Sequence, residues 1–165
     1  MSDIINEIQS KIKSKILFDY DMGKSTWFRT GGKAKGFVTV NNLKDLKTIV
    51  SYKDKIKYSI IGVGSNTLVR DSGYDGLIIK LGKNFNKIKI SNNILTAGAA
   101  VLDINLAKFA LKNLIKDFEF FIGIPGTVGG AVKMNAGCYG SQTSDNLKRV
   151  LVLNSQGKFQ YINLK

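Results

Sequence analysis

Residues 123–140 read GIPGTVGGAVKMNAGCYG and hold six of the chain's 17 glycines and its only proline. Glycine has no Cβ, so a glycine-rich backbone lets another group come close to the main chain. Pro125 fixes its own φ and offers no N–H. Ile124, Val128 and Met134 interrupt the glycines and favour burial. The pattern indicates a buried wall of backbone against a flat ligand, and a set of tight turns between core elements is the alternative.

A second glycine-rich stretch, YSIIGVGSNTLVR at 58–70, follows an apolar run. A tight turn after a strand can present successive backbone N–H groups to an anion. The stretch is not the dinucleotide fingerprint, because Thr67 stands where the third glycine is required and no clear helix follows. It is not a Walker loop, because no Gly-Lys-Ser/Thr ends it. The stretch therefore indicates a phosphate-binding loop, with an ordinary hairpin turn as the alternative.

The reactive side chains are few. The chain has one cysteine, Cys138, and no histidine, which excludes an internal disulfide, a Ser-His-Asp triad and zinc sites of the histidine or cysteine-cluster kind. We expect no metal site. Glu119 lies among Phe118, Phe120 and Phe121; a desolvated glutamate would have a raised pKa and could be catalytic, and a salt bridge or a helix cap is the alternative. The chemistry must otherwise come from a cofactor or from residues elsewhere.

The net charge of +13 raises a second class of function, a basic nucleic-acid-binding module. The basic residues are scattered through every segment, so we expect no nucleic-acid partner, although the charge should steer anionic ligands toward the protein. No apolar run approaches the roughly 20 residues that span a bilayer, and no membrane partner is expected. Asp3 and Glu7 near the N-terminus do not fit a signal peptide, which predicts a cytoplasmic protein.

Periodicity and turn residues predict the elements that position these stretches. The first half reads as a βαβ unit followed by short strands, which predicts a small mixed sheet and an α+β fold. Helices are expected over 2–15, 42–53 and 101–115, strands over 37–40, 58–61, 67–70 and 77–80, and hairpins over 86–97 and 148–163.

Three ordered motifs together resemble the UDP-N-acetylenolpyruvoylglucosamine reductase (MurB) family. They are GVGSN at 62–66, GIPGTVGGA at 123–131 and MNAGCYG at 134–140, preceded by Thr30-Gly31-Gly32. The resemblance runs from about residue 25 to the end of the chain. It implies an FAD-binding domain of the vanillyl-alcohol-oxidase (PCMH) type, in which FAD lies between two α+β lobes. We accordingly expect an N-terminal helix at 1–20, a first lobe at 21–90 and a second lobe, incomplete at its C-terminus, at 91–165.

The resemblance and the chemistry of FAD together predict the cofactor-binding residues. The pyrophosphate needs the N–H groups of 62–66, and the flat isoalloxazine needs the backbone of 123–140. Asn135 and the backbone near Gly137 would serve its polar edge, with Tyr139 and Ile124 as apolar walls. The residues expected to bind FAD are Ile61, Gly62, Val63, Gly64, Ser65, Asn66, Thr67, Ile124, Pro125, Gly126, Thr127, Gly129, Gly130, Asn135, Ala136, Gly137, Tyr139 and Gly140.

The resemblance also implies a reaction. NADPH reduces the flavin, whose N5 delivers hydride to UDP-N-acetylglucosamine enolpyruvate, giving UDP-N-acetylmuramate for peptidoglycan synthesis and so for cell-wall biogenesis, shape and division. The family's assisting arginine belongs to a Tyr-Arg-x-Ser motif, and its proton-donating serine and glutamate belong to a third domain. The sequence stops at Lys165 before these motifs, so we expect no catalytic residue within this chain, FAD binding without turnover, and a missing third domain. Another FAD oxidoreductase of the same fold is the alternative. Cys138 replaces the family's usual alanine, as a tolerated small residue or as a reactive thiol.

Overall fold

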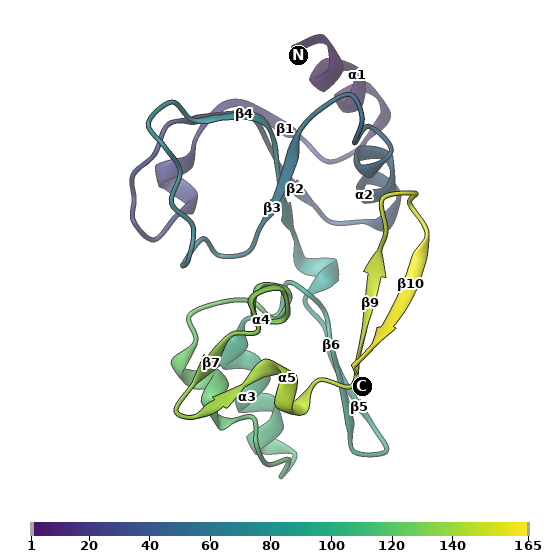
Figure 1. Cartoon of the computed structure of the whole chain (residues 1–165). Coiled ribbons are helices and arrows are strands. Elements are labelled where there is room, and N and C mark those ends of the chain that lie inside the picture. The colour runs from purple at the N-terminus through teal and green to yellow at the C-terminus, as the bar shows by residue number, and fades with distance from the viewer. Residues whose placement is uncertain (1, 165) are drawn as a thin grey trace. The chain divides into compact units, whose positions relative to one another are not determined.

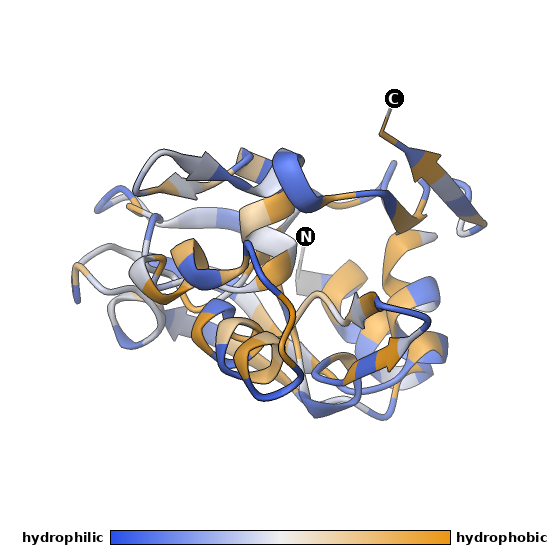
Figure 2. Cartoon of the chain, turned by 90° about the horizontal axis from the view of Figure 1, so that it is seen from below, coloured by the Kyte–Doolittle hydropathy of each residue, from blue (hydrophilic) through white to orange (hydrophobic). Residues whose placement is uncertain are grey.

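The computed structural model describes residues 2–164 and shows two compact units (Figure 1). Unit 1 comprises Met1–Gly82 and Leu151–Gln160, and unit 2 comprises Lys83–Val150 and Tyr161–Lys165. The helix and strand content confirms the predicted α+β class. Apolar and polar residues are mixed along the chain (Figure 2). None of the helices within residues 2–164 is long and apolar enough to cross a membrane.

Unit 1 is built on a four-stranded mixed sheet, as predicted, in the order β1-β2-β4-β3. Strand β1 (Ile16–Asp21) runs antiparallel to β2 (Lys33–Val40), while β4 (Tyr74–Leu81) runs parallel to both β2 and β3 (Tyr58–Ile61). Apolar residues fill both faces of the two central strands, because Phe37 pairs with Ile78 and the next residues, Val38 and Ile79, point to the opposite side. Such two-sided burial is the usual condition of parallel strands.

Two helices lie on one side of this sheet (Figure 1), α1 (Ser2–Lys11) and α2 (Leu43–Val50). Helix α2 begins at the start of the predicted helix 42–53, where the Asn42 side chain caps it by accepting from the Asp45 N–H at 2.8 Å. Both helices end earlier than predicted, at Lys11 and Val50, and residues 51–56 form turns instead of a further helical turn.

A buried carboxylate joins the two helices of unit 1. Asp45 is 1% exposed, and its Oδ2 accepts from Ser14 N (2.7 Å), Ser14 Oγ (2.7 Å) and Lys13 N (3.1 Å), just beyond the end of α1. Burial opposes the ionisation of Asp45, but these hydrogen bonds prevail and hold its pKa below the ordinary value. The carboxylate therefore fixes the α1–β1 connection against α2.

Unit 2 contains a hairpin and a compact helical part. Strands β5 (Ile88–Ser91) and β6 (Ile94–Ala97) meet at the predicted turn, where Asn92 and Asn93 both have positive φ. The remaining elements are η2 (Lys83–Phe85), α3 (Asp103–Lys112), η3 (Glu119–Gly123), α4 (Val128–Met134), β7 (Gly137–Cys138), β8 (Ser141–Gln142) and α5 (Thr143–Asn146). Their core consists of Val101, Leu106, Ala107, Phe120, Phe121 and Ala131.

The predicted C-terminal hairpin is also present, as β9 (Arg149–Leu153) and β10 (Phe159–Asn163). The side-chain oxygen Oδ1 of Asn154 accepts hydrogen bonds from the N–H groups of Gln156 and Lys158, and these bonds close the loop. Gly157 adopts φ +72° in this loop.

Two further expectations were wrong, and one strand was not predicted. Residues 67–70 form no strand: the Arg70 carbonyl accepts from Gly32 N and Gly73 N, which makes a turn, and Leu68 is 70% exposed. Strand β1 lies in a stretch for which no strand was predicted. Met134 is 52% exposed at the end of α4 instead of buried.

Candidate functional site

The loop that follows β3 contacts other residues of unit 1. Ile61 is buried at the end of β3, and the Trp27 N–H donates to the Gly64 carbonyl at 3.0 Å. Gly64 has φ +72°, and a Cβ added there would lie 2.1 Å from the Ser25 carbonyl oxygen. The fold of unit 1 therefore requires glycine at position 64, whatever ligand the loop takes.

We expect Gly64→Ala to destabilise the ligand-free chain by roughly 3 kcal/mol or more, because the new methyl group overlaps rigid backbone and the left-handed φ adds strain. Urea unfolding followed by circular dichroism measures the loss. The matched control is Gly157→Ala, which has the same φ of +72° but would meet nothing within 4 Å; it should lose only about 1 kcal/mol. Equal losses in the two variants would show that contact with Ser25 is not the cause.

The segment 124–129 of unit 2 lies against residues 99–103. Asp103 N donates to the Gly126 carbonyl (3.1 Å), Val128 N donates to Val101 O (2.9 Å), and Leu102 lies opposite Thr127 in a bridge. The Gly126 N–H also donates to Ile124 O at 2.9 Å, which makes a tight bend around Pro125. These bonds fix a bend that leads directly into α4.

The six glycines of residues 123–140 differ in what would exclude a larger residue at their position. A Cβ would collide with neighbours at less than 3.0 Å at Gly123, Gly126, Gly129 and Gly137, and Gly140 has φ +80°. Gly130 has neither constraint. It lies inside α4, and a Cβ there would meet only Thr127 Oγ1, at an ordinary 3.5 Å. Nothing in unit 2 therefore explains a glycine at position 130.

Asn135 ends α4 in the left-handed conformation, with φ +48°. Its side-chain amide is engaged within unit 2: Oδ1 accepts from Ser144 N, and Nδ2 donates to Gln142 Oε1, each at 2.9 Å. The amide predicted to serve a flavin edge thus already holds the β8–α5 connection. Ala136 O accepts from the Thr143 N–H and hydroxyl, and Gly137 pairs with Gln142.

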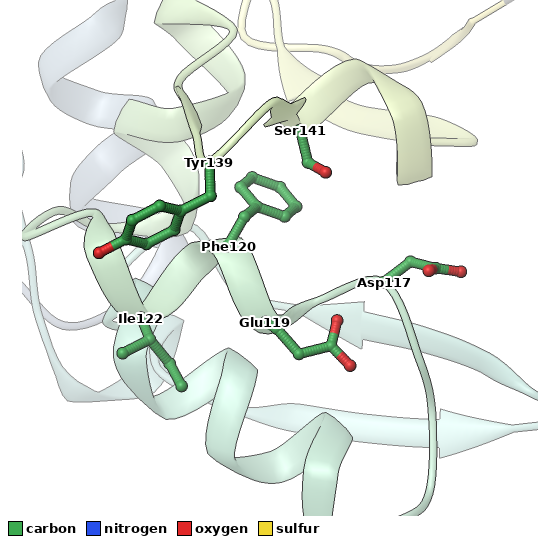
Figure 3. Close-up of a pocket in the computed structure, with 6 residues that line it drawn as sticks. All are labelled: Asp117, Glu119, Phe120, Ile122, Tyr139 and Ser141. Atoms are coloured by element: carbon green, nitrogen blue, oxygen red, sulfur yellow. The ribbon is translucent and has the colours of Figure 1, made fainter.

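Beyond this segment, Tyr139 is 85% exposed and lines a pocket of about 400 Å³ (Figure 3). The other lining residues are Asp117, Glu119, Phe120, Ile122 and Ser141. Carboxylates and hydroxyls form its polar part, and Phe120 and Ile122 its apolar part. Of the readings left open for Glu119, a desolvated catalytic carboxyl does not fit the structure, since this residue is exposed at the start of η3. Asp117 and Ser141 were not singled out, although Ser141 directly follows the third motif.

The predicted cofactor residues fall into two groups. Those at 61–67 lie in unit 1, and those at 124–140 lie in unit 2. Among residues 2–164 there is no group of three or more cysteine or acidic side chains that could hold a metal ion. The predicted residues of both groups offer main-chain amides and close-approach backbone, and none of them is acidic, basic or a cysteine.

Two curated relatives from different organisms share one name. The chain is 46% identical over 156 residues to UDP-N-acetylenolpyruvoylglucosamine reductase of Pelagibacter ubique, covering 93% of this chain and 52% of that protein. It is 44% identical over 149 residues to the reductase of the same name from Rickettsia prowazekii, covering 90% of this chain and 50% of the relative. The resemblance expected from the motifs is confirmed, and the chain spans about half the length of the curated relatives it matches.

Solved structures agree with the fold. UDP-N-acetylenolpyruvylglucosamine reductase (MurB) from Thermus caldophilus matches with a TM-score of 0.75 and 30% identity over 92% of this chain and 52% of that chain. The 6-hydroxy-D-nicotine oxidase of Arthrobacter nicotinovorans matches with a TM-score of 0.66 at 21% identity, over 92% of this chain and 36% of that one, which shows a shared fold alone.

The sequence also matches the family described as FAD binding domain over residues 34–163, a range that includes both glycine-rich stretches. The predicted FAD-binding fold is thereby confirmed, and this chain belongs to the FAD-binding-domain family.

Proposed function

We propose that this chain is the FAD-binding half of a UDP-N-acetylenolpyruvoylglucosamine reductase. The identity to curated relatives of that name supports the proposal over nine-tenths of the chain. The activity of the whole protein, with NADPH as hydride source and UDP-N-acetylglucosamine enolpyruvate as substrate, is part of the same proposal. We expect it to need residues from the part of the relatives that these 165 residues do not match. The cytoplasmic location stays a prediction.

The observation that carries the cofactor assignment is the open face of α4 at Gly130. A glycine inside a helix is less stable than alanine by roughly 0.5–1 kcal/mol. No neighbour in unit 2 excludes a methyl group at Gly130, since its Cβ would meet only Thr127 Oγ1. A flat ligand lying against this face would account for the glycine, because it would occupy the space that the methyl group would fill.

The residues present fit FAD. The 62–66 loop would offer N–H groups to the pyrophosphate, Ile124 and the Gly129–Gly130 face would support the ring system, and Tyr139 would add an apolar wall. When bound, FAD supplies hydride-transfer chemistry. The chain's own contribution is to bind and orient the cofactor and to exclude water from one of its faces. No side chain of this chain is assigned a proton transfer with the substrate.

The test is a flavin titration of the purified chain. We expect about one FAD per chain, with quenched flavin fluorescence and the visible absorption bands of oxidised flavin in the retained protein. Steady-state turnover with NADPH and the enolpyruvyl substrate should be absent for the 165 residues alone. A folded chain that retains no flavin would contradict the cofactor assignment, and turnover by this chain alone would contradict the division of labour between the two halves.

A further inference from the structure

Asp103 is a buried carboxyl group without partners. It is the first residue of α3, it is 0% exposed, and neither Oδ1 nor Oδ2 has a hydrogen-bond partner among the residues that the structure describes. Asp45, equally buried, accepts three hydrogen bonds. Buried polar groups are normally satisfied, so an orphaned carboxyl calls for an explanation in terms of charge or function.

The Asp103 carboxyl lies against the bend of the flavin segment. A Cβ added at Gly126 would be 2.6 Å from Asp103 Oδ2, and the Asp103 N–H donates to the Gly126 carbonyl at 3.1 Å. The next residue, Thr127, lies opposite Leu102. The main chain and the side chain of Asp103 thus both contact the turn that leads into α4 and its open Gly130 face.

No charge compensates this carboxyl. Burial raises the pKa of Asp103 to about 7 and is the only cause of the shift. The charged side chains of α3 and of the elements packed on it are Lys89 of the β5–β6 hairpin, Lys108, Lys112, Glu119 and Lys133, and all five are exposed. The neutral acid is therefore the form that this apolar site accepts, and the ionised form has to reach water or N–H donors. Asp103 can do so only by moving away from the Gly126 bend or by moving the bend.

We propose that Asp103 is a proton-linked positioning residue for the flavin: the neutral acid holds the Ile124–Thr127 bend against α3, and ionisation releases the bend and weakens cofactor binding. The inference rests on the proposed FAD-binding function. If FAD binds only the neutral form, its affinity falls as pH rises through the pKa of Asp103, and by linkage FAD binding draws a proton onto the chain.

The experiment measures FAD dissociation by flavin fluorescence at pH 6 and pH 8, for the unaltered chain, Asp103→Asn and the exposed control Asp54→Asn. We expect about tenfold weaker binding at pH 8 than at pH 6 in the unaltered chain and the control, and a change of less than about twofold in Asp103→Asn, which has the same shape but cannot ionise. In weak buffer at pH 8, FAD addition should take up nearly one proton per chain, and close to none in Asp103→Asn.

The outcomes separate the two proposals. FAD binding with the same pH dependence in Asp103→Asn as in the unaltered chain would overturn the inference and leave the proposed function standing. No FAD binding by the unaltered chain at either pH would overturn the proposed function and this inference with it. If Asp103→Asn does not fold, proton uptake by the unaltered chain decides: no uptake at pH 8 overturns the inference, and uptake near one supports it.

Discussion

Gly130→Ala is expected to weaken FAD binding by about 10- to 100-fold while leaving the ligand-free chain as stable as before, or more stable by up to about 1 kcal/mol. The two effects have different origins. The methyl group finds free space in unit 2, because its nearest neighbour outside the helix backbone is Thr127 Oγ1 at 3.5 Å. It also removes the entropic disadvantage of a glycine in α4. The same methyl group would occupy the space that we assign to the cofactor.

Measuring both quantities makes the result informative. Urea unfolding of the ligand-free chain gives the stability, and flavin fluorescence gives the dissociation constant. Lys133→Ala is the control, because Lys133 is an exposed residue of the same helix outside the predicted site; it should change neither quantity by more than about 0.5 kcal/mol. Unchanged FAD affinity in Gly130→Ala would remove the observation on which the cofactor assignment depends.

Local signals predicted the elements that have strong caps or turns. Asn42 caps α2, and Asn92-Asn93 takes the left-handed conformation that a two-residue hairpin needs. Strand β1 was missed because its burial does not alternate: only Ile16 is buried, and the strand exists through its pairing with β2. Residues 67–70 have the composition of a strand, but they form a turn in which the Arg70 carbonyl accepts hydrogen bonds from the N–H groups of Gly32 and Gly73. Pairing between distant segments decided both cases, and a single segment carries no signal of it.

The candidate site shows the same division between what is local and what is not. The glycine motifs can be read directly from the sequence, and the number of glycines in them led to the expectation of a flavin-binding backbone. Gly64 and Gly130 nevertheless differ. A Cβ at Gly64 would lie 2.1 Å from the Ser25 carbonyl oxygen, whereas a Cβ at Gly130 would meet no close neighbour and would point into the space that we assign to the cofactor. In sequence, Asp103 is an ordinary acidic residue in the first turn of a helix. Its burial depends on the bend at Gly126, about twenty residues further along the chain, and no pattern within α3 reveals it.

The second large effect concerns stability and pH. We expect the free energy of unfolding of the ligand-free chain to fall relative to that of Asp103→Asn by up to about 4 kcal/mol between pH 4 and pH 8. The folded-state pKa of Asp103 is about 7, against an ordinary value of 3.8. Between these two pH values the folded chain holds a proton that the unfolded chain has lost, so each step up in pH favours unfolding. The contribution of the protonated Asp103 to the free energy of unfolding is fully present below about pH 4 and is lost above about pH 7. Asp103→Asn lacks this contribution at every pH.

Asp45 provides the opposite sign within the same chain. Its folded-state pKa lies below the ordinary value, so its contribution is present above about pH 4 and is lost as the pH falls further. Asp45→Asn should therefore be less stable than the unaltered chain at neutral pH, whereas Asp103→Asn should gain stability relative to it as the pH rises from 4 to 8. Chemical unfolding of the three proteins at pH 3, 4, 6 and 8 separates the two slopes. If the difference in free energy of unfolding between Asp103→Asn and the unaltered chain stays constant with pH, Asp103 already has partners for its charge. Its ionisation would then not change the Gly126 bend.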